Sequence, residues 1–509
     1  MVFSQVHSLG LLGIDGYPVE VEADISQGLP GFDIVGMPGP AVKESRDRVR
    51  AAMKNCGFSF PVSRITVNLA PADVKKEGSV YDLPLLLALL RAGGQLSFNL
   101  SNMAFIGELS LTGEVRPVHG VLPMVLAARK AGIATMFIPK ANAAEGAVVD
   151  GITVFAVDHI KTLLAHLSGE GPLTALPKTE FNPHTDAAIP DFSEVMGQAI
   201  PRRAMEIAAA GNHNILLVGP PGSGKSMLAK RLPSILPDMT REEALEATSV
   251  HSIVGTLPAD VGLLSSRPFR SPHHTVSAVG LTGGGAVPRP GEVSLAHNGV
   301  LFLDELPEFS RQATEGLRQP LEDQRVTISR ASGSLTYPCS FMLVAAMNPC
   351  ACGYYGHPTR ECTCSAHSVT RYLSRISGPL LDRFDLHVEV PPVGYIDLNA
   401  KDPSENSASI RERVNTARRV QLERYAGTRI RTNSQLTPSL LRRHCALSPD
   451  AETLMESAFD RLGLSARAYD RLLKVARTIA DLDGSEKLRI EHLSEAIQYR
   501  SLDRKYWHR

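Results

Sequence analysis

Hydrophobic residues recur along this chain either at every second position, as in strands, or at every third or fourth position, as in helices. The order of these two patterns predicts the secondary-structure elements. Before residue 168, strand-like and helix-like stretches alternate. Arg64–Leu69 alternates apolar and polar residues as a strand does, whereas residues 82–91 and 121–131 have the length and apolar content of helices. Gly132 follows the second helical stretch, where a helix end is expected. The pattern therefore predicts an N-terminal α/β domain over residues 1–167.

Two further patterns follow this domain. Continuously apolar runs at 215–218, 300–303 and 341–347 each lead into glycine or polar residues, as buried parallel strands do. They predict an α/β core over residues 191–392. Beyond it the period becomes helical, which predicts a helical domain over residues 393–509. Its amphipathic stretches lie near residues 407–426, 438–445, 450–462, 466–482 and 489–499.

The segment 168–190 separates the first two domains. It contains four prolines, three threonines and two glycines and has no sustained period, so we interpret it as a linker. A chain of 509 residues is long enough for about three domains.

Composition limits the cellular compartment and the kinds of partner that we expect. The chain has 53 basic and 53 acidic residues, so any contact with nucleic acid must come from a local basic patch. Its most apolar run, 83–90, is too short to cross a membrane, and the first sixteen residues lack the features of a signal peptide. Four of the seven cysteines lie within residues 350–364, which favours a metal site over disulfides. We expect a cytoplasmic protein without membrane contact.

A phosphate-binding loop follows the apolar run 215–218. The sequence GPPGSGKS fits the pattern G-x-x-x-x-G-K-[ST] and precedes a helical stretch. Glycines let such a loop wrap phosphates with its backbone N–H groups, the lysine reaches the β- and γ-phosphates, and the hydroxyl binds Mg²⁺. The chain is therefore predicted to bind a nucleoside triphosphate and Mg²⁺. The predicted binding residues are Gly219, Pro220, Pro221, Gly222, Ser223, Gly224, Lys225 and Ser226.

Further NTPase residues follow in the expected order. The run 300–303 ends in Asp304 and Glu305, which we predict to hold Mg²⁺ and to activate the attacking water, respectively. Asn348 ends the next apolar run and is predicted to position that water. Arg383 is predicted to neutralise transition-state charge across a subunit interface, and Arg467 to sense the nucleotide from the helical domain. Surface salt bridges are the alternative for both arginines.

The cysteine-rich segment carries separate chemistry. Cys350, Cys352, Cys362 and Cys364 form two C-x-C pairs, which can close tetrahedrally on Zn²⁺. Free or reactive thiols are the alternative. We predict a zinc knuckle at residues 350–364, inserted in the core.

Taken together, GPPGSGKS, LFLDE, Asn348, LLDRFD and SARAYDR resemble the AAA+ ATPases of the magnesium-chelatase-like branch. The segments GLPGFDIVGMPGPAVKESRDRVRAAM and LAPADVKKEGSVYDLP narrow the resemblance to the ComM/YifB-like proteins of bacteria. This resemblance implies an N-terminal α/β domain like the protease domain of Lon (S5-like), an AAA+ core with a doubly wound parallel sheet, and a C-terminal helical lid. It also implies a ring, with a hexamer expected, in which ATP lies between subunits.

Two glycine- or serine-rich loops are candidate DNA contacts. One insert contains Arg270 and Arg289, and a predicted hairpin over residues 326–335 carries Arg330 near its tip. In the resembling family an insert at the first position points into the ring's pore, and arginines there would contact a phosphate backbone. Ordinary surface loops are the alternative.

The N-terminal domain raises the question of proteolysis. Where Lon-like proteases have their serine and lysine, this chain has Val80 and Leu122, and Ser79 lies one position early. We therefore do not expect protease activity. The resemblance implies a DNA helicase that promotes branch migration in natural transformation, with recombination proteins as possible partners. A protein-remodelling or chelatase-like motor acting through a partner is the alternative.

Overall fold

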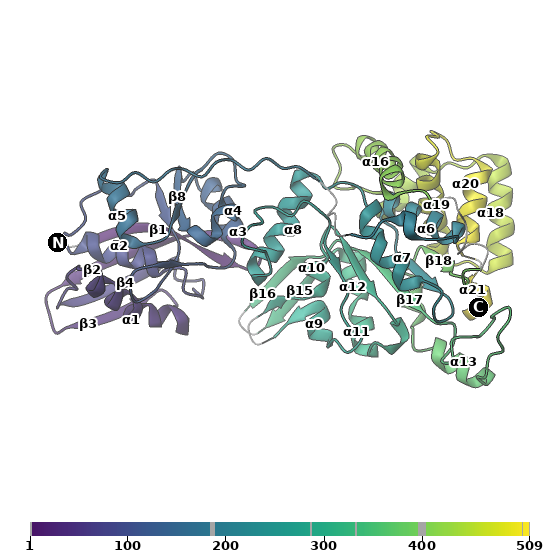
Figure 1. The fold of residues 1–509 in the computed structure, drawn as a ribbon, viewed down its shortest axis with the longest axis horizontal. Helices are drawn as coiled ribbons and strands as arrows, with labels where there is room; N and C mark the ends of the chain where they lie inside the picture. Colours follow the sequence, from purple (N-terminus) through teal and green to yellow (C-terminus); the bar gives the residue numbers. More distant parts are fainter. Residues whose placement is uncertain are drawn as a thin grey trace. The chain divides into compact units, whose positions relative to one another are not determined.

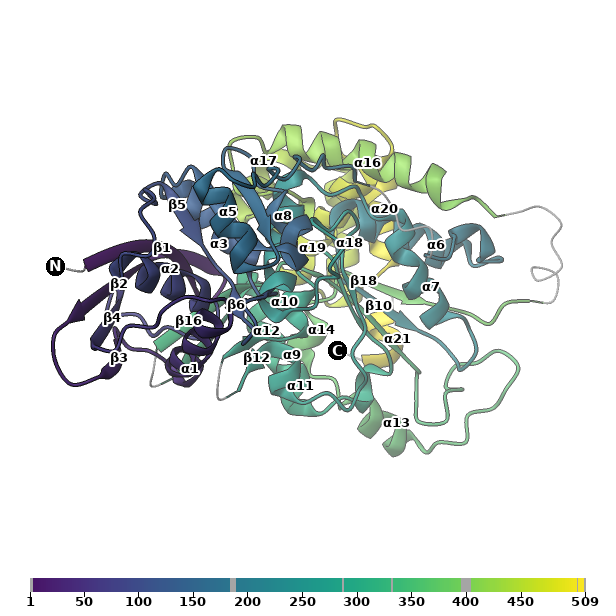
Figure 2. The same cartoon turned by 60° about the vertical axis from the view of Figure 1, so that its left-hand side comes forward.

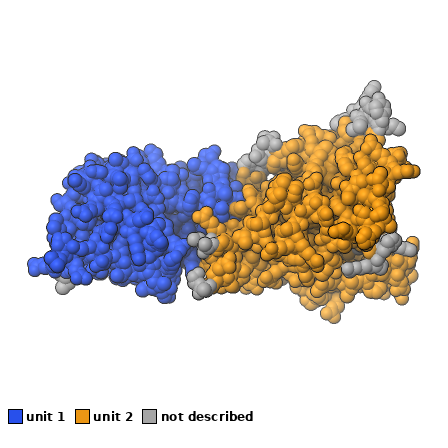
Figure 3. Space-filling model, turned by 90° about the horizontal axis from the view of Figure 1, so that it is seen from below, with its two compact units in different colours: residues 1–182, 245–264 blue, residues 183–244, 265–509 orange. Residues whose placement is uncertain are grey.

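The computed structural model describes residues 3–183, 189–285, 288–330, 333–394, 404–500 and 502–507. The undescribed positions include parts of the predicted linker, of the glycine-rich insert and of the hairpin tip. The chain divides into two compact units (Figure 3): residues 1–182 with 245–264, and residues 183–244 with 265–509. The sequence-based boundaries instead assign residues 245–264 to the ATPase core.

The first unit is built on a seven-stranded mixed sheet with the order β3-β4-β2-β1-β5-β8-β9. Strands β1, β2 and β4 pair antiparallel, whereas β5, β8 and β9 are parallel to their neighbours. The strands are β1 (Phe3–Leu12), β2 (Asp15–Ser26), β3 (Gly31–Val35), β4 (Arg64–Ala70), β5 (Met103–Phe105), β8 (Thr135–Pro139) and β9 (Thr153–Val157), and a small ribbon joins β6 (Glu108–Leu109) to β7 (Val115–Arg116).

Helices complete the first unit: α1 (Pro40–Asn55), α2 (Asp82–Ala92), α3 (Val121–Lys130), α4 (Ala143–Gly146) and α5 (Ile160–Ser168). The apolar stretch of α2 is buried on all sides because the helix lies inside the unit's hydrophobic core. The predicted strand at Arg64–Leu69 and the predicted helices at 82–91 and 121–131 are all present.

Residues from the middle of the chain belong to this unit as well. Helix α8 (Arg241–Val254) begins among residues of the second unit and continues among residues of the first. Leu245 and Leu263 pack against the first unit's core, and Ser252 accepts a hydrogen bond from the Gly120 N–H through its carbonyl. The segment 245–264 is thus part of this unit's packing.

The second unit contains a five-stranded parallel sheet with the order β11-β14-β17-β10-β18. Its strands are β10 (Ile215–Val218), β11 (Phe269–Arg270), β14 (Val300–Leu303), β17 (Met342–Met347) and β18 (Leu386–Glu389). Residues of β10, β14 and β17 are buried throughout, which explains their continuously apolar sequences. The α/β core predicted from these runs is confirmed.

Helices α6 (Ala199–Gly211) and α7 (Lys225–Arg231) pack on this sheet. The same part of the unit also contains α9 (Ala278–Thr282), α10 (Glu292–Leu295), α11 (Arg311–Gly316), α12 (Arg318–Asp323), α13 (Ala366–Leu373) and α14 (Gly378–Leu381). Two hairpins extend the unit, β12 (Gly283–Gly284) with β13 (Arg289–Pro290) and β15 (Arg325–Arg330) with β16 (Gly333–Pro338). The second is the hairpin predicted at 326–335.

The C-terminal part is helical, as predicted, with α16 (Ser407–Arg424), α17 (Pro438–His444), α18 (Pro449–Leu462), α19 (Ala466–Leu482), α20 (Ile490–Gln498) and α21 (Leu502–Trp507). Helices α16 and α19 pack against α6 of the core (Figures 1 and 2). No helix among the described residues combines the length and apolarity needed to span a bilayer.

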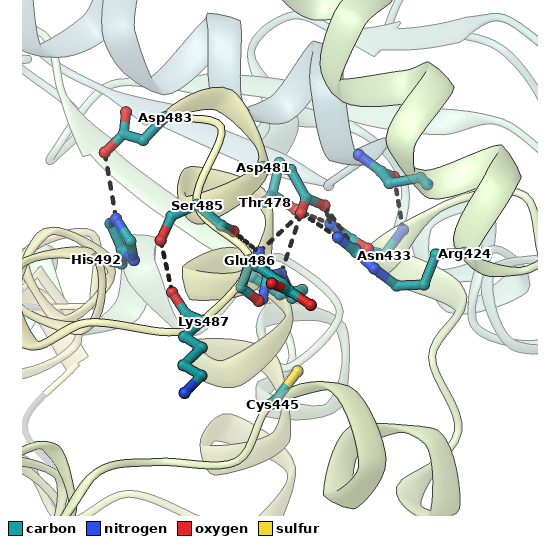
Figure 4. A network of polar contacts seen from close by, with 12 residues as sticks. Arg424, Asn433, Cys445, Thr478, Asp481, Asp483, Ser485, Glu486, Lys487 and His492 are labelled. Atoms are coloured by element: carbon teal, nitrogen blue, oxygen red, sulfur yellow. Dashed lines mark hydrogen bonds and ion pairs between the residues drawn. The ribbon is translucent and has the colours of Figure 1, made fainter.

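A buried polar network fastens the C-terminal helices together (Figure 4). Its centre is Asp481, whose side chain is 0% exposed and pairs with Arg424 at 2.5 Å and with Arg477 at 3.0 Å. Asn433 donates its side-chain N–H to Asp481 at 2.8 Å and to Thr478 at 3.0 Å. These contacts satisfy a carboxylate that burial would otherwise destabilise.

Candidate nucleotide-binding site

The phosphate-binding loop sits at the carboxyl edge of the central sheet. Strand β10 lies between β17 and β18, and residues 219–224 connect it to α7. Because the strands are parallel, the residues that follow β14 and β17 lie at the same edge of the sheet as the loop. The fold therefore brings the loop, the Asp304–Glu305 pair and Asn348 together.

Two glycines show why the loop needs its sequence. A Cβ at Gly219 would overlap the carbonyl oxygen of Val390, and Gly224 has φ +89°, in the left-handed region that favours glycine. The Ser223 hydroxyl is buried, and its oxygen has no hydrogen-bond partner among the described residues. An orphaned hydroxyl inside a tightly wrapped loop fits a site made for phosphate oxygens.

Lys225 is held at the centre of the site. Its ammonium donates hydrogen bonds to the carbonyls of Gly219 and Pro220, both at 2.8 Å, and to Asn348 Oδ1 at 3.1 Å. Burial lowers the pKa of Lys225 to about 8, and the charges of Asp304 and Glu305 oppose this only in part. The lysine thus lies between the loop and the predicted water-positioning asparagine.

The two carboxylates take different positions. Asp304 Oδ2 accepts a hydrogen bond from the Ser226 hydroxyl at 2.6 Å, so the two predicted Mg²⁺ ligands adjoin each other. These oxygens suit the hard ligand preference of Mg²⁺. Glu305 is exposed, and its carboxylate lies 3.6 Å from His274 Nδ1.

Sequence reasoning gave no role to two residues of this site. Gln198 donates its side-chain N–H to the Ser223 carbonyl at 2.5 Å and so braces the loop. His274 stands beside Glu305. Both come from outside the motif, and a lone glutamine or histidine carries no recognisable pattern.

Arg383, predicted to act across a subunit interface, and Arg467, predicted to sense the nucleotide, line one hollow of about 660 Å³. Arg467 is exposed at the start of α19, whereas Arg383 is 7% exposed and pairs with Glu322. Asn214, Phe341 and Asp385 also line the hollow, and each directly precedes a strand of the parallel sheet. The hollow therefore lies at the amino edge, and four-residue strands separate it from the phosphate-binding loop by about 13 Å.

The four clustered cysteines converge. Their sulfurs all lie within 4.8 Å of one another, with 3.3 Å between Cys350 and Cys352, 3.7 Å between Cys350 and Cys362, and 3.6 Å between Cys352 and Cys362. Cys364 completes the group. This arrangement can hold a metal ion.

The three predicted DNA-contacting arginines differ in their surroundings. Arg270 is engaged by Glu292 through two hydrogen bonds of 2.7 and 2.9 Å, and this carboxylate raises the pKa of the guanidinium. Arg289 and Arg330 are exposed. Their hairpins adjoin, because Tyr337 donates its hydroxyl hydrogen to the Pro288 carbonyl at 3.1 Å.

The first unit has apolar side chains at the two positions that the sequence analysis compares with the serine and lysine of Lon-like proteases. Val80 and Leu122 are buried in its core. The Leu122 N–H donates to Glu145 at 2.7 Å, and Glu145 also accepts from Ser252 of the 245–264 segment. Residues 80 and 122 are thus part of the core packing of this unit.

Comparisons with known proteins agree with this geometry. Residues 191–398 match the family described as magnesium chelatase, subunit ChlI, residues 21–142 match subunit ChlI of Mg-chelatase, and residues 404–500 match the C-terminal part of that subunit. The first unit also resembles the Lon protease of Mycolicibacterium smegmatis, at 31% identity over 26% of this chain and 18% of Lon.

Two relatives match almost end to end. The YifB protein of Escherichia coli (strain K12) is 45% identical over 99% of this chain and 98% of its own length. The competence protein ComM of Haemophilus influenzae is likewise 45% identical, over 99% of this chain and 98% of its own length. With these likenesses spanning both units and the nucleotide site, the chain belongs to the ComM/YifB family of magnesium-chelatase-like AAA+ proteins.

Proposed function

We propose that this protein is an ATP-hydrolysing ring motor that acts on DNA, as a helicase that promotes branch migration. The convergence of Lys225, the Ser226–Asp304 pair and Asn348 at one sheet edge carries the ATPase part of the proposal. The relative named a competence protein suggests the process, natural transformation. The proposed working location is the cytoplasm, and recombination proteins are proposed partners.

Each residue of the site has a distinct proposed task. Lys225 binds the β- and γ-phosphates in place of the carbonyls that now accept its hydrogen bonds. Ser226 and Asp304 hold Mg²⁺, which neutralises charge on the transferring phosphoryl group. Glu305 accepts a proton from the attacking water, and Asn348 orients that water through its side-chain amide.

The two arginines in the hollow act on a neighbouring subunit's ATP. The sheet stands between Arg383 and the phosphate-binding loop of its own chain, so Arg383 reaches a γ-phosphate only across a subunit interface. Arg467 lines the same hollow, so the nucleotide that it is proposed to sense is also that of the neighbouring subunit. A ring, proposed as a hexamer, supplies such an interface at every subunit. In it, Arg383 exchanges the Glu322 carboxylate for phosphate.

The adjoining hairpins are the proposed DNA contact. Arg289 and Arg330 are exposed on two hairpins that pack together, so their guanidinium groups can follow one phosphate backbone. Arg270 supports this surface indirectly, because its charge is engaged by Glu292. The four clustered cysteines are proposed to bind Zn²⁺, since four thiolates in this arrangement suit its tetrahedral preference.

Strand displacement on forked and three-stranded DNA tests the proposal. Wild-type protein should displace a strand only with ATP, and Lys225→Ala should abolish the reaction. Arg330→Ala should slow displacement, whereas Arg325→Ala, at the base of the same hairpin, should not. ATP hydrolysis that ignores DNA, without displacement, would overturn the DNA assignment. It would favour a protein-remodelling or chelatase-like motor acting through a partner.

A further inference from the structure

The cysteine cluster is compact enough to enclose a zinc ion. Four sulfurs bound tetrahedrally at about 2.3 Å from zinc lie about 3.8 Å from one another. The sulfur–sulfur distances of 3.3, 3.6 and 3.7 Å among Cys350, Cys352 and Cys362 fall close to this value, and Cys364 lies within 4.8 Å of all three. The four cysteines are free of disulfides.

This cluster sits directly on the phosphate-binding loop. Gly353 lies against the ring of Pro221: a Cβ added to Gly353 would overlap Pro221 Cδ and lie 2.6 Å from its Cγ. Gly353 is also hydrogen-bonded back to the Cys350 carbonyl at 3.0 Å. The turn that carries the first two thiolates and ends at Gly353 is therefore the surface that supports Pro221.

The cluster is also joined covalently to the other side of the ATP site. Cys350 is fully buried and follows Asn348 by two residues, and Asn348 accepts a hydrogen bond from Lys225. The cysteine turn also makes a non-covalent connection to the end of β18. Tyr355 packs near Tyr506, with 6.3 Å between ring centroids, and Tyr506 donates its hydroxyl hydrogen to Glu389. The cysteine turn thus connects the loop, Asn348 and the end of β18.

We propose that Zn²⁺ bound by these four cysteines shapes the ATP site, so that zinc occupancy controls nucleotide binding and hydrolysis. The inference rests on the proposed ATPase function and not on the DNA function. A segment this short has no core of its own, and metal ligation replaces one. Without the metal, the turn at Gly353 loses its closure. Pro221 then loses its support, and Asn348 loses the anchor two residues after it.

Two kinds of variant test this proposal in the full-length protein. Cys362→Ser with Cys364→Ser removes two ligands that are distant in sequence from Asn348. Gly353→Ala keeps all four thiolates but places a methyl group against Pro221. Gly356→Ala is the matched control. It has the same left-handed backbone, with φ +74° against +85° at Gly353, but its nearest neighbour is the flexible Lys505 side chain, 3.5 Å from the added Cβ.

Three measurements are made on each protein without DNA: zinc per chain by atomic emission, binding of a fluorescent ATP analogue, and steady-state hydrolysis. Wild type should contain one zinc per chain. The cysteine variant should lose zinc and at least ten-fold in ATP affinity or turnover, and a zinc chelator should have the same effect on wild type. Gly353→Ala should keep zinc yet lose several-fold in affinity, with Gly356→Ala near wild type.

Several results would overturn the proposal. These are metal-free wild type, a zinc-free cysteine variant that hydrolyses ATP normally, and equal behaviour of the two glycine variants. Circular dichroism and thermal melting identify a variant that fails to fold, and reversible chelation of wild type still decides in that case. Absence of any ATP hydrolysis in zinc-loaded wild type would instead refute the proposed ATPase function.

Discussion

The buried lysine of the phosphate-binding loop makes ATP binding depend on pH in a defined direction. Lys225 is 8% exposed, and burial lowers its pKa to about 8. Below this pH the free protein already carries the ammonium that the triphosphate needs. Above it the amine is neutral, so ATP binding must take up a proton. Because the phosphates favour the charged form, affinity should fall as pH rises through 8.

The size of the effect follows from the pKa. With a value of about 8, roughly nine-tenths of Lys225 is charged at pH 7 and roughly one-tenth at pH 9. The Kd for ATP should therefore rise about ten-fold over this interval, or about 1.4 kcal/mol. The triphosphate adds little to this change, because phosphate groups with a pKa near 6 are already ionised.

Isothermal titration calorimetry in buffers of different ionisation enthalpy measures both quantities. Proton uptake per ATP should rise from about 0.1 at pH 7 to about 0.9 at pH 9. Lys225→Arg is the control, since a guanidinium keeps its charge throughout and should remove the pH dependence even if binding is weaker. A flat Kd without proton uptake in wild type would refute the reasoning.

The remaining predictions concern hydrolysis, stability and DNA. Glu305→Gln should bind ATP normally but hydrolyse it about 100-fold more slowly, because the general base is lost; rapid steady-state turnover would contradict this role. Asp481→Asn should lower the free energy of unfolding by about 3 kcal/mol, since it leaves Arg477 and Arg424 without a buried counter-charge. Urea denaturation measures this, and an unchanged midpoint would count against it. Arg330→Ala should reduce by about one the slope of log DNA affinity against log salt; an unchanged slope would show that Arg330 contacts no phosphate.

The residues of the candidate nucleotide site could be predicted from the sequence because each part of the site is a short, continuous motif. The loop, the acidic pair at the end of β14 and Asn348 each follow an apolar run. A parallel sheet brings the ends of such runs to one edge, whichever strands are neighbours. The cysteine cluster could also be predicted from the sequence, because the spacing of its two C-x-C pairs is typical of a metal site.

Features that depend on long-range pairing were beyond such reasoning. Arg270 was predicted to contact DNA, but in the structure its guanidinium donates hydrogen bonds to Glu292. No local sequence pattern indicates a partner 22 residues away. The placement of Gln198 against Ser223 is equally non-local. The position of Gly353 against Pro221 required the structure, because a glycine in a turn indicates flexibility and not what it touches.

The discontinuity of the first unit has a consequence for how the protein is made. Residues 1–182 leave the ribosome before residues 245–264, which pack into the same core through Leu245 and Leu263. At 5–20 residues per second, the 82 residues from 183 to 264 take about 4–16 s to synthesise. During this interval the nascent unit exposes the apolar surface that the late segment covers. We therefore expect a fragment that ends at residue 182 to keep this apolar surface exposed, and expect the fragment to be stabilised when residues 245–264 are supplied through a short linker.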